Sequence, residues 1–257
     1  MTACDLVVDV SEDWVLACAV QQRFMHGPGR NTGAVDYSGR CRQVRALGGD
    51  CYDFMPLPDD RLSFVVGDAS GKGLAAALMI ASVQSSLRTA ALFTGNDLAE
   101  LLKIVNLQAY ASSLDDRYAT VFYGVFDRAA RTLRHVNAGH NPPAVLRNNG
   151  SVHWLEPGGP PVGMFPDSNY RESVFQLQPG DLVVAYTDGV TEATDPGCEE
   201  WGVEGLLKAV AAWEPQSSQG AEDLVQSIFN SMHDFSRGCQ TDDATRSSPA
   251  RGLTMSR

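Results

Sequence analysis

The chain has 257 residues, of which 44% are hydrophobic, and its formal net charge at pH 7 is −11. This length suits one large domain. The acidic charge and the lack of a Lys/Arg cluster argue against partners such as nucleic acid or an anionic membrane. Six scattered cysteines form no CxxC pair, no basic leader is present, and no apolar run approaches the ~20 residues of a membrane span. We therefore expect a cytoplasmic protein with free thiols.

The first element expected is an amphipathic helix over residues 12–25. Its apolar residues recur at roughly helical spacing and include Trp14, Leu16 and Val20, and the sequence His-Gly-Pro-Gly at 26–29 ends it. Either the helix packs on its own domain, or it is a regulatory helix that could form a homodimer. The polar, glycine-rich segment that follows indicates a loop, so residues 1–40 are expected to form an N-terminal helix and loop.

A β-hairpin is expected next. Residues 61–67 indicate a strand, residues 48–54 (GGDCYDF) indicate its partner, and residues 56–60 form a turn of prolines and acids. Pairing of the two strands would bring Asp50, at one strand end, close to Asp68 at the other.

In the rest of the chain, helices and strands are expected in separate blocks. Helices are expected over residues 74–93 and 97–113, and β-rich runs over 118–126 and 132–136 indicate a second hairpin. The later elements are short strands at 144–147, 152–155, 173–177 and 181–186, and helices at 203–210 and 221–235. Segregated strands and helices favour an α+β fold with antiparallel sheet covered by helices.

Three acids share one local setting. Asp50, Asp68 and Asp188 each follow an extended run and lie beside glycine, and Asp242 and Asp243 follow a helix. Carboxylates about 5 Å apart at an effective dielectric of ~20 repel by roughly 3 kcal/mol per pair, so a convergent cluster needs cations. Oxygen ligands without His or Cys select Mg²⁺ or Mn²⁺, and two such ions can activate water and clamp a phosphate. Each acid alone is also an ordinary turn residue.

The order of five motifs adds a family resemblance. The motifs are GGDCYDF at 48–54, GDASGKG at 67–73, AGHNPP at 138–143, TDGVTEA at 187–193 and DDAT at 242–245. With these motifs in this order, the sequence resembles, from about residue 42 to 245, the SpoIIE/RsbU-like serine phosphatases, the bacterial branch of the metal-dependent type 2C protein phosphatases. The resemblance implies an αββα sandwich, in which two antiparallel β-sheets are flanked by helices.

The same resemblance implies a site with two Mn²⁺ or Mg²⁺ ions. Asp68 would bridge the ions and the Ala69 carbonyl would bind one of them, while Asp50, Asp188 and Asp242 would complete the ligand set. Asp68 and Asp188 would be the residues closest to the chemistry. Asp243 is the substitute for Asp242.

Three further positions could support this site. Gly71 and Lys72 lie in the turn after Asp68, where the lysine could bind phosphate or be a solvated turn residue. His140 could donate a proton to the leaving serine oxygen. A structural role for His140, holding its proline-rich loop, is the favoured alternative.

The chemistry implied is hydrolysis of phosphoserine or phosphothreonine in a protein by a metal-activated water, without a phosphoenzyme. In this family the usual substrate is a phosphorylated anti-anti-sigma factor of the STAS fold. That partner is implied by the resemblance alone.

The end of the chain departs from the family. After residues 242–245 the family continues into an apolar strand, whereas Pro249 and Gly252 oppose a strand here. We therefore expect the final strand to be missing or altered, a catalytic domain over residues 41–245, and a disordered tail over 246–257. A phosphatase-fold protein that is catalytically impaired and serves as a protein-binding module is the alternative function.

Overall fold

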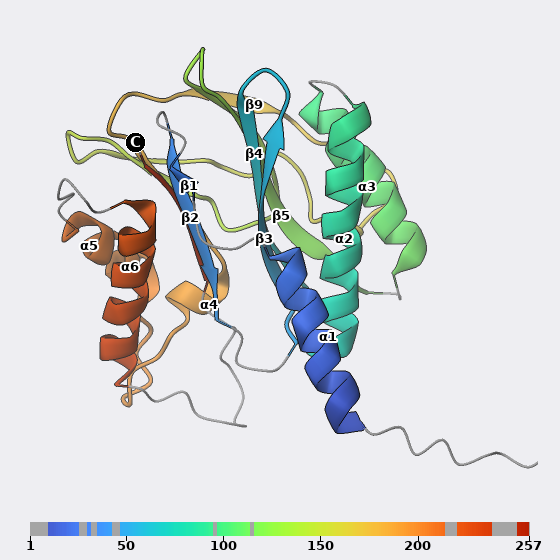
Figure 1. Cartoon of the computed structure of the whole chain (residues 1–257), viewed down its shortest axis with the longest axis horizontal. Coiled ribbons are helices and arrows are strands. Elements are labelled where there is room, and N and C mark those ends of the chain that lie inside the picture. The colour runs from blue at the N-terminus through green and yellow to red at the C-terminus, as the bar shows by residue number, and fades with distance from the viewer. Residues whose placement is uncertain are drawn as a thin grey trace, which may run out of the picture.

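The computed structural model is built of four layers, with two β-sheets packed face to face between pairs of helices (Figure 1). It describes residues 10–25, 30–31, 35–42, 47–94, 97–113, 116–213, 220–237 and 251–256. Both sheets are antiparallel throughout. The α+β fold expected from the sequence and the αββα sandwich implied by the family resemblance are therefore confirmed.

The first sheet, sheet B, has the strand order β3-β4-β5-β6-β9. Its strands are β3 (Asp50–Leu57), β4 (Arg61–Ala69), β5 (Ala119–Asp127), β6 (Thr132–Ala138) and β9 (Ser173–Gln176). Both predicted hairpins are present, because β3 pairs with β4 and β5 pairs with β6.

The second sheet, sheet A, has the order β1-β2-β11-β10-β7-β8. Its strands are β1 (Arg30–Asn31), β2 (Asp36–Cys41), β7 (Ala144–Leu146), β8 (Val152–Trp154), β10 (Leu182–Tyr186) and β11 (Arg251–Ser256). The expectation of a loop up to residue 40 is wrong for β2. Tyr37 and Ser38 are buried in this strand, whose sequence signal is obscured by Gly39 and by polar neighbours.

The last strand, β11, corrects the expectation of a missing strand and a disordered tail. It lies between β2 and β10 and pairs antiparallel with both. The expectation gave weight to Pro249, but the strand begins after the proline, at Arg251. Hydrogen bonding to a strand on each side offsets the weak strand propensity of Gly252. Residues 246–250 lie outside the described residues.

The helices cover the outer faces of the sandwich. Sheet B carries α2 (Leu74–Phe93) and α3 (Leu98–Ser112), and sheet A carries α5 (Gly202–Ala211) and α6 (Ala221–Ser236). The short α4 (Asp188–Thr191) follows β10. Asp97 caps α3, since its carboxylate accepts a hydrogen bond from the Glu100 N–H at 2.9 Å. By length and composition α2 could cross a membrane; in the structure one face of it, with Ile80, Val83 and Leu87, is buried on sheet B.

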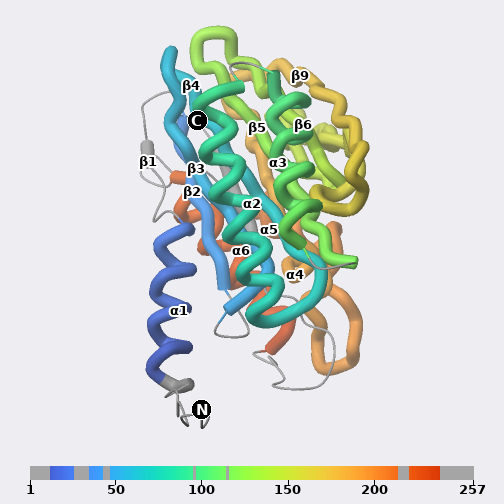
Figure 2. Tube along the Cα trace, turned by 90° about the vertical axis from the view of Figure 1, so that its right-hand side faces the viewer, coloured from blue at the N-terminus to red at the C-terminus, as the bar shows by residue number. Residues whose placement is uncertain are grey.

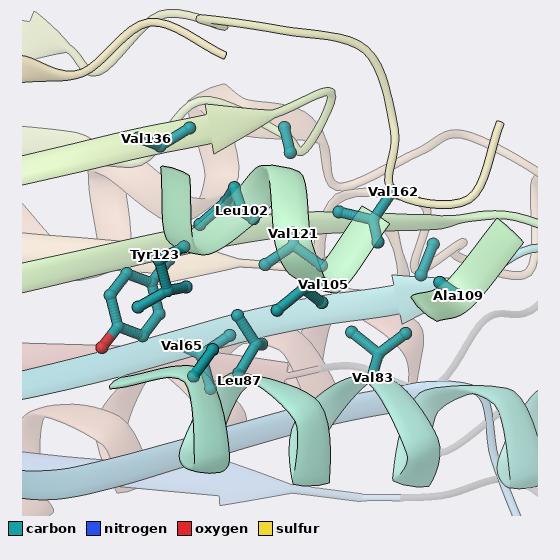
Figure 3. Packing of buried hydrophobic residues seen from close by; sticks show 14 of the residues in the cluster. Val65, Val83, Leu87, Leu102, Val105, Ala109, Val121, Tyr123, Val136 and Val162 are labelled. Carbon is teal, nitrogen blue, oxygen red and sulfur yellow. The ribbon is translucent and has the colours of Figure 1, made fainter. Parts of the chain in front are cut away.

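Three apolar clusters hold the layers together. One lies between sheet B and the helices α2 and α3, where Val65, Val121 and Tyr123 of the sheet meet Leu87 and Leu102 (Figure 3). A second fills the space between the sheets, and a third joins sheet A to α5 and α6. Each fully buried Leu or Val contributes about 1.5–3 kcal/mol.

The N-terminal helix α1 (Val10–Phe24) lies along the outside of the molecule, against α2 (Figures 1 and 2). The expected apolar face is largely exposed, because Val15 and Leu16 are 69% and 62% exposed. Among residues 12–24 the buried side chain is that of Gln21. The helix therefore packs on its own domain, as one of the two alternatives expected, but not through a continuous apolar face.

Candidate active site

The first two acids of the candidate site are direct neighbours across a strand pair. Asp50 opens β3, Asp68 lies near the end of β4, and the two are Cα partners in the antiparallel register. Asp50 is 2% exposed and Asp68 is half-buried. Directly opposed side chains have Cβ atoms about 4.5–5.5 Å apart, and like charges at such a pair are destabilising. The predicted approach of Asp50 to Asp68 is confirmed.

The pleat of sheet B decides which way these acids point. Side chains alternate between the two faces of a strand, so Asp50 shares a face with Tyr52, and Asp68 shares one with Val66. Tyr52 and Val66 belong to the cluster between the sheets. Thr120, the Cα partner of Asp68 on β5, continues the same row. The two acids therefore lie on the face of sheet B that is turned toward sheet A.

The side chain of Asp53 lies on the other face of sheet B and has a different role. It points toward α2, where Arg88 binds its carboxylate in a bidentate pair at 2.5 and 2.9 Å. Asp53 is 0% exposed. The motif at residues 48–54 thus supplies one acid to the inter-sheet face and one to a structural ion pair.

Gly49 makes room for two oxygen atoms. A Cβ atom at this position would lie 2.9 Å from the Ala69 carbonyl oxygen and 3.3 Å from Oδ1 of Asp68. The Ala69 N–H also donates a 2.9 Å hydrogen bond to the Gly49 carbonyl, which fixes the two strand ends against each other. Two oxygen atoms therefore approach the same point beside a residue that has no side chain. Such an oxygen cradle suits a hard divalent cation.

Asp188 comes from the other sheet. It is the first residue of α4, directly after the end of β10, and its side chain is half-buried. Thr191 donates a hydrogen bond to the Asp188 carbonyl at 3.1 Å and so closes this single turn. The first three acids thus lie at the ends of strands in two facing sheets.

His140 lies against β5, the strand beside Asp68. Its Nδ1 lies 2.9 Å from the hydroxyl of Thr120, and its backbone N–H donates to the side-chain oxygen of Asn137 at 2.8 Å. Its Nε2 is buried without a hydrogen-bond partner among the described residues. The residue is 3% exposed, and burial lowers the pKa of His140 to about 4, against the opposing effect of the Tyr186 carbonyl. This surrounding favours the structural role over the general-acid role.

The turn after Asp68 holds the remaining predicted residues. Gly71 has φ +90°, a conformation that favours glycine, and Lys72 is exposed to solvent. Asp242 and Asp243 lie outside the described residues. In the ranges that the structure covers, no group of three or more His, Cys, Asp or Glu side chains is placed to hold a metal ion. The Asp50–Asp68 pair with the Ala69 carbonyl therefore represents only part of the ligand set that was predicted.

Two residues that contact the segments around Asp50 and Asp68 were not predicted from the sequence. The side chain of Gln21 donates to the Gly48 carbonyl at 2.7 Å and accepts from the Gly48 N–H at 3.2 Å, and so holds the backbone two residues before Asp50. The guanidinium of Arg117 donates to the Ser70 carbonyl at 3.0 Å. Neither residue belongs to a motif, and only a polar residue within an amphipathic helix could have drawn attention to Gln21.

Comparison with known proteins shows to which family the chain belongs. The family described as "Stage II sporulation protein E (SpoIIE)" matches residues 58–246, so the chain belongs to the SpoIIE family. Protein IcfG of Synechocystis sp. is 31% identical over 198 residues, which are 66% of this chain and 31% of that protein. Phosphoserine phosphatase RsbU of Bacillus subtilis is 25% identical over 229 residues, which are 87% of this chain and 65% of RsbU. The chain therefore spans less than two thirds of either relative.

Solved structures agree on the fold. The SiaA-PP2C domain of Pseudomonas aeruginosa superposes with a TM-score of 0.77 at 17% identity, covering 96% of this chain and 97% of that domain. At this identity the likeness concerns the fold alone. The two-sheet sandwich described above is thus a PP2C-type fold.

Proposed function

We propose that this chain is a metal-dependent protein serine/threonine phosphatase that hydrolyses phosphoserine or phosphothreonine. The observation that carries the proposal is the direct opposition of Asp50 and Asp68 beside the oxygen cradle at Gly49. Two carboxylates at directly opposed positions repel each other unless a cation lies between them. Membership of the SpoIIE family, whose relative RsbU is named a phosphoserine phosphatase, supports the reaction.

The residues proposed to hold two Mn²⁺ or Mg²⁺ ions are Asp50, Asp68, the carbonyl of Ala69, Asp188 and Asp242. Bound there, such ions would lower the pKa of a water molecule and offset charge on phosphoryl oxygens. The chain's own part is to hold the carboxylates in position. The β3–β4 ladder fixes Asp50 against Asp68, and the buried His140 binds the hydroxyl of Thr120 on β5, the strand that pairs with β4 at Asp68.

The proposed substrate is a phosphorylated STAS-domain anti-anti-sigma factor. RsbU and RsbP are named phosphoserine phosphatases, and the family membership supports a phosphoprotein substrate here. The alternative, an impaired protein-binding module, rested on loss of the last strand. Since β11 is present in the middle of sheet A, that argument no longer favours the module.

The test is hydrolysis of an aryl phosphate and of a phosphorylated STAS domain, each with and without Mn²⁺. Loss of a residue that only hydrogen-bonds a metal ligand typically lowers metal affinity or activity about 10–100-fold. Asp68 is proposed as a direct ligand, so Asp68→Asn should lower activity by more than about 100-fold. It should also abolish the rise in melting temperature that Mn²⁺ gives the wild type. Asp59→Asn is the matched control, because Asp59 is an exposed acid at the opposite end of the same hairpin. Activity that survives Asp68→Asn would disprove the two-metal site.

A further inference from the structure

Arg117 is fastened to the turn that follows the proposed metal ligands. It lies just before β5, and its guanidinium donates to the Ser70 carbonyl at 3.0 Å. Two further hydrogen bonds join the same segments, from the Ser70 N–H to the Tyr118 carbonyl at 2.8 Å and from the Tyr118 N–H to the Ser70 hydroxyl at 3.0 Å. The position of Arg117 relative to the turn is therefore fixed by three bonds.

Gly71 provides the space for this guanidinium. A Cβ atom at Gly71 would lie 1.7 Å from Nη1 of Arg117 and 2.9 Å from its Cζ, which is closer than atoms can approach. Gly71 follows Ala69 by two residues, so at most about 7 Å of backbone separates the proposed carbonyl ligand from the point under the guanidinium. The guanidinium thus contacts the turn that directly follows the proposed carbonyl ligand.

Among the described residues, Arg117 forms no ion pair with a carboxylate. Arg88, Arg134 and Arg147 each form an ion pair with a carboxylate, and the partners are Asp53, Glu172 and Asp181. Arg117 is also partly buried, yet within the described ranges its guanidinium donates only to the neutral Ser70 carbonyl. A guanidinium has five N–H donors, so most of them remain for a ligand.

We propose that Arg117 binds the phosphoryl group of the substrate. The proposal rests on the proposed function, because the phosphoryl group is what the neighbouring acids and their cations would position. Arginine presents paired N–H donors that match phosphate oxygens, and its charge does not depend on pH in the physiological range. In this arrangement Gly71 has two tasks, since it allows the turn and leaves the guanidinium in contact with it.

The test is the binding of inorganic phosphate, measured by calorimetry in the presence of Mn²⁺, together with the KM for an aryl phosphate. Hydrogen bonds to charged groups are worth about 1.5–3 kcal/mol, so Arg117→Ala should weaken phosphate binding about 10- to 100-fold. Arg117→Lys should recover part of the loss. The melting temperature without phosphate should fall only slightly, because one hydrogen bond to Ser70 is lost, and its rise with Mn²⁺ should persist, which separates a ligand contact from a folding defect.

Arg131→Ala is the matched control, because Arg131 is an exposed arginine near the opposite end of β5. Phosphate binding that is equal in Arg117→Ala and the wild type, or absent from both, would overturn the proposal. A higher KM for the phosphoprotein alone, with phosphate and aryl phosphate unaffected, would place Arg117 against the protein part of the substrate and would also overturn it. If the wild type binds phosphate through Arg117 but hydrolyses no ester, the proposed function fails while the binding role holds.

Discussion

Single residues in this chain take their roles from the side of the sheet on which they fall. Asp50 and Asp53 are three positions apart in one strand, yet the pleat turns the first toward sheet A and the second toward α2. One lies at the proposed metal site, and the other is neutralised by Arg88. Proximity in the motif therefore says little about shared function.

The Asp53–Arg88 pair gives a prediction about stability. Replacing Arg88 by methionine leaves a carboxylate that is 0% exposed without its guanidinium. Breaking a fully buried pair typically costs about 3–5 kcal/mol, and because the Arg88 side chain is 36% exposed the lower end of that range applies here. We expect the free energy of unfolding, measured in urea, to fall by that amount. The double variant Asp53→Asn/Arg88→Met should recover part of the loss. A single variant as stable as the wild type would contradict this account.

Buried histidines predict a loss of stability in acid. Burial lowers the pKa of His135 to about 4, against opposing effects of the Leu133 backbone and the charge of Glu172, whereas the unfolded value is near 6.5. The unfolded state therefore binds the proton first as pH falls. The stabilisation is complete above about pH 6.5 and is lost toward pH 4, at about 1.4 kcal/mol per pH unit for such a residue.

The corresponding measurement is the free energy of unfolding at several pH values between 7.5 and 4.5. His135→Gln should reduce its slope by about 1.4 kcal/mol per pH unit. His233→Gln, which changes an exposed histidine on α6, should leave the slope as it is in the wild type. An unchanged slope in His135→Gln would show that His135 is not the group responsible.

At the scale of elements, α1 is attached to the site by polar contacts rather than by an apolar face. Gln21 holds the Gly48 backbone at both its N–H and its carbonyl, and Gln84 of α2 donates to the Phe24 carbonyl at 2.6 Å. Displacement of α1 would therefore release the segment that leads into Asp50.

We expect Gln21→Ala to weaken activation by Mn²⁺ about 10-fold, at the lower end of the effect of outer-shell partners. The measurement is the Mn²⁺ concentration at half-maximal activity, together with the Mn²⁺-induced rise in melting temperature. Gln22→Ala is the control, because Gln22 is the exposed neighbour on the same helix. If both variants respond to Mn²⁺ alike, α1 has no influence on the site through this contact.

Elements with strong local signals were predictable, and those held by distant partners were not. The hairpin that pairs Asp50 with Asp68 follows from strand propensity and an acidic, proline-containing turn, and the extent of α2 follows from its alanines and leucines. By contrast, β2 and β11 contain glycine and polar residues and are stabilised by pairing with each other. The same reason explains why the site was predicted only in part. The contact of Arg117 with Ser70 joins segments 47 residues apart, so no local pattern indicates it.

For the whole molecule, the central position of β11 predicts that the end of the chain is essential. Removing residues 251–257 would leave β2 and β10 without the strand between them. We expect the free energy of unfolding to fall by more than about 4 kcal/mol, a loss beyond that of most single substitutions. Urea unfolding and limited proteolysis would measure this, with removal of Arg257 alone as the control. A shortened chain with an unchanged urea midpoint would contradict the central placement of β11.

The division of the acids between the two sheets has a consequence for the folding of the chain. Asp50 and Asp68 lie on sheet B, whereas Asp188 follows a strand of sheet A. A nascent or partly unfolded molecule that has formed only one sheet holds an incomplete set of these carboxylates. Under the proposed function it would leave phosphoproteins untouched, so the onset of hydrolysis during refolding would report the moment at which the two halves dock.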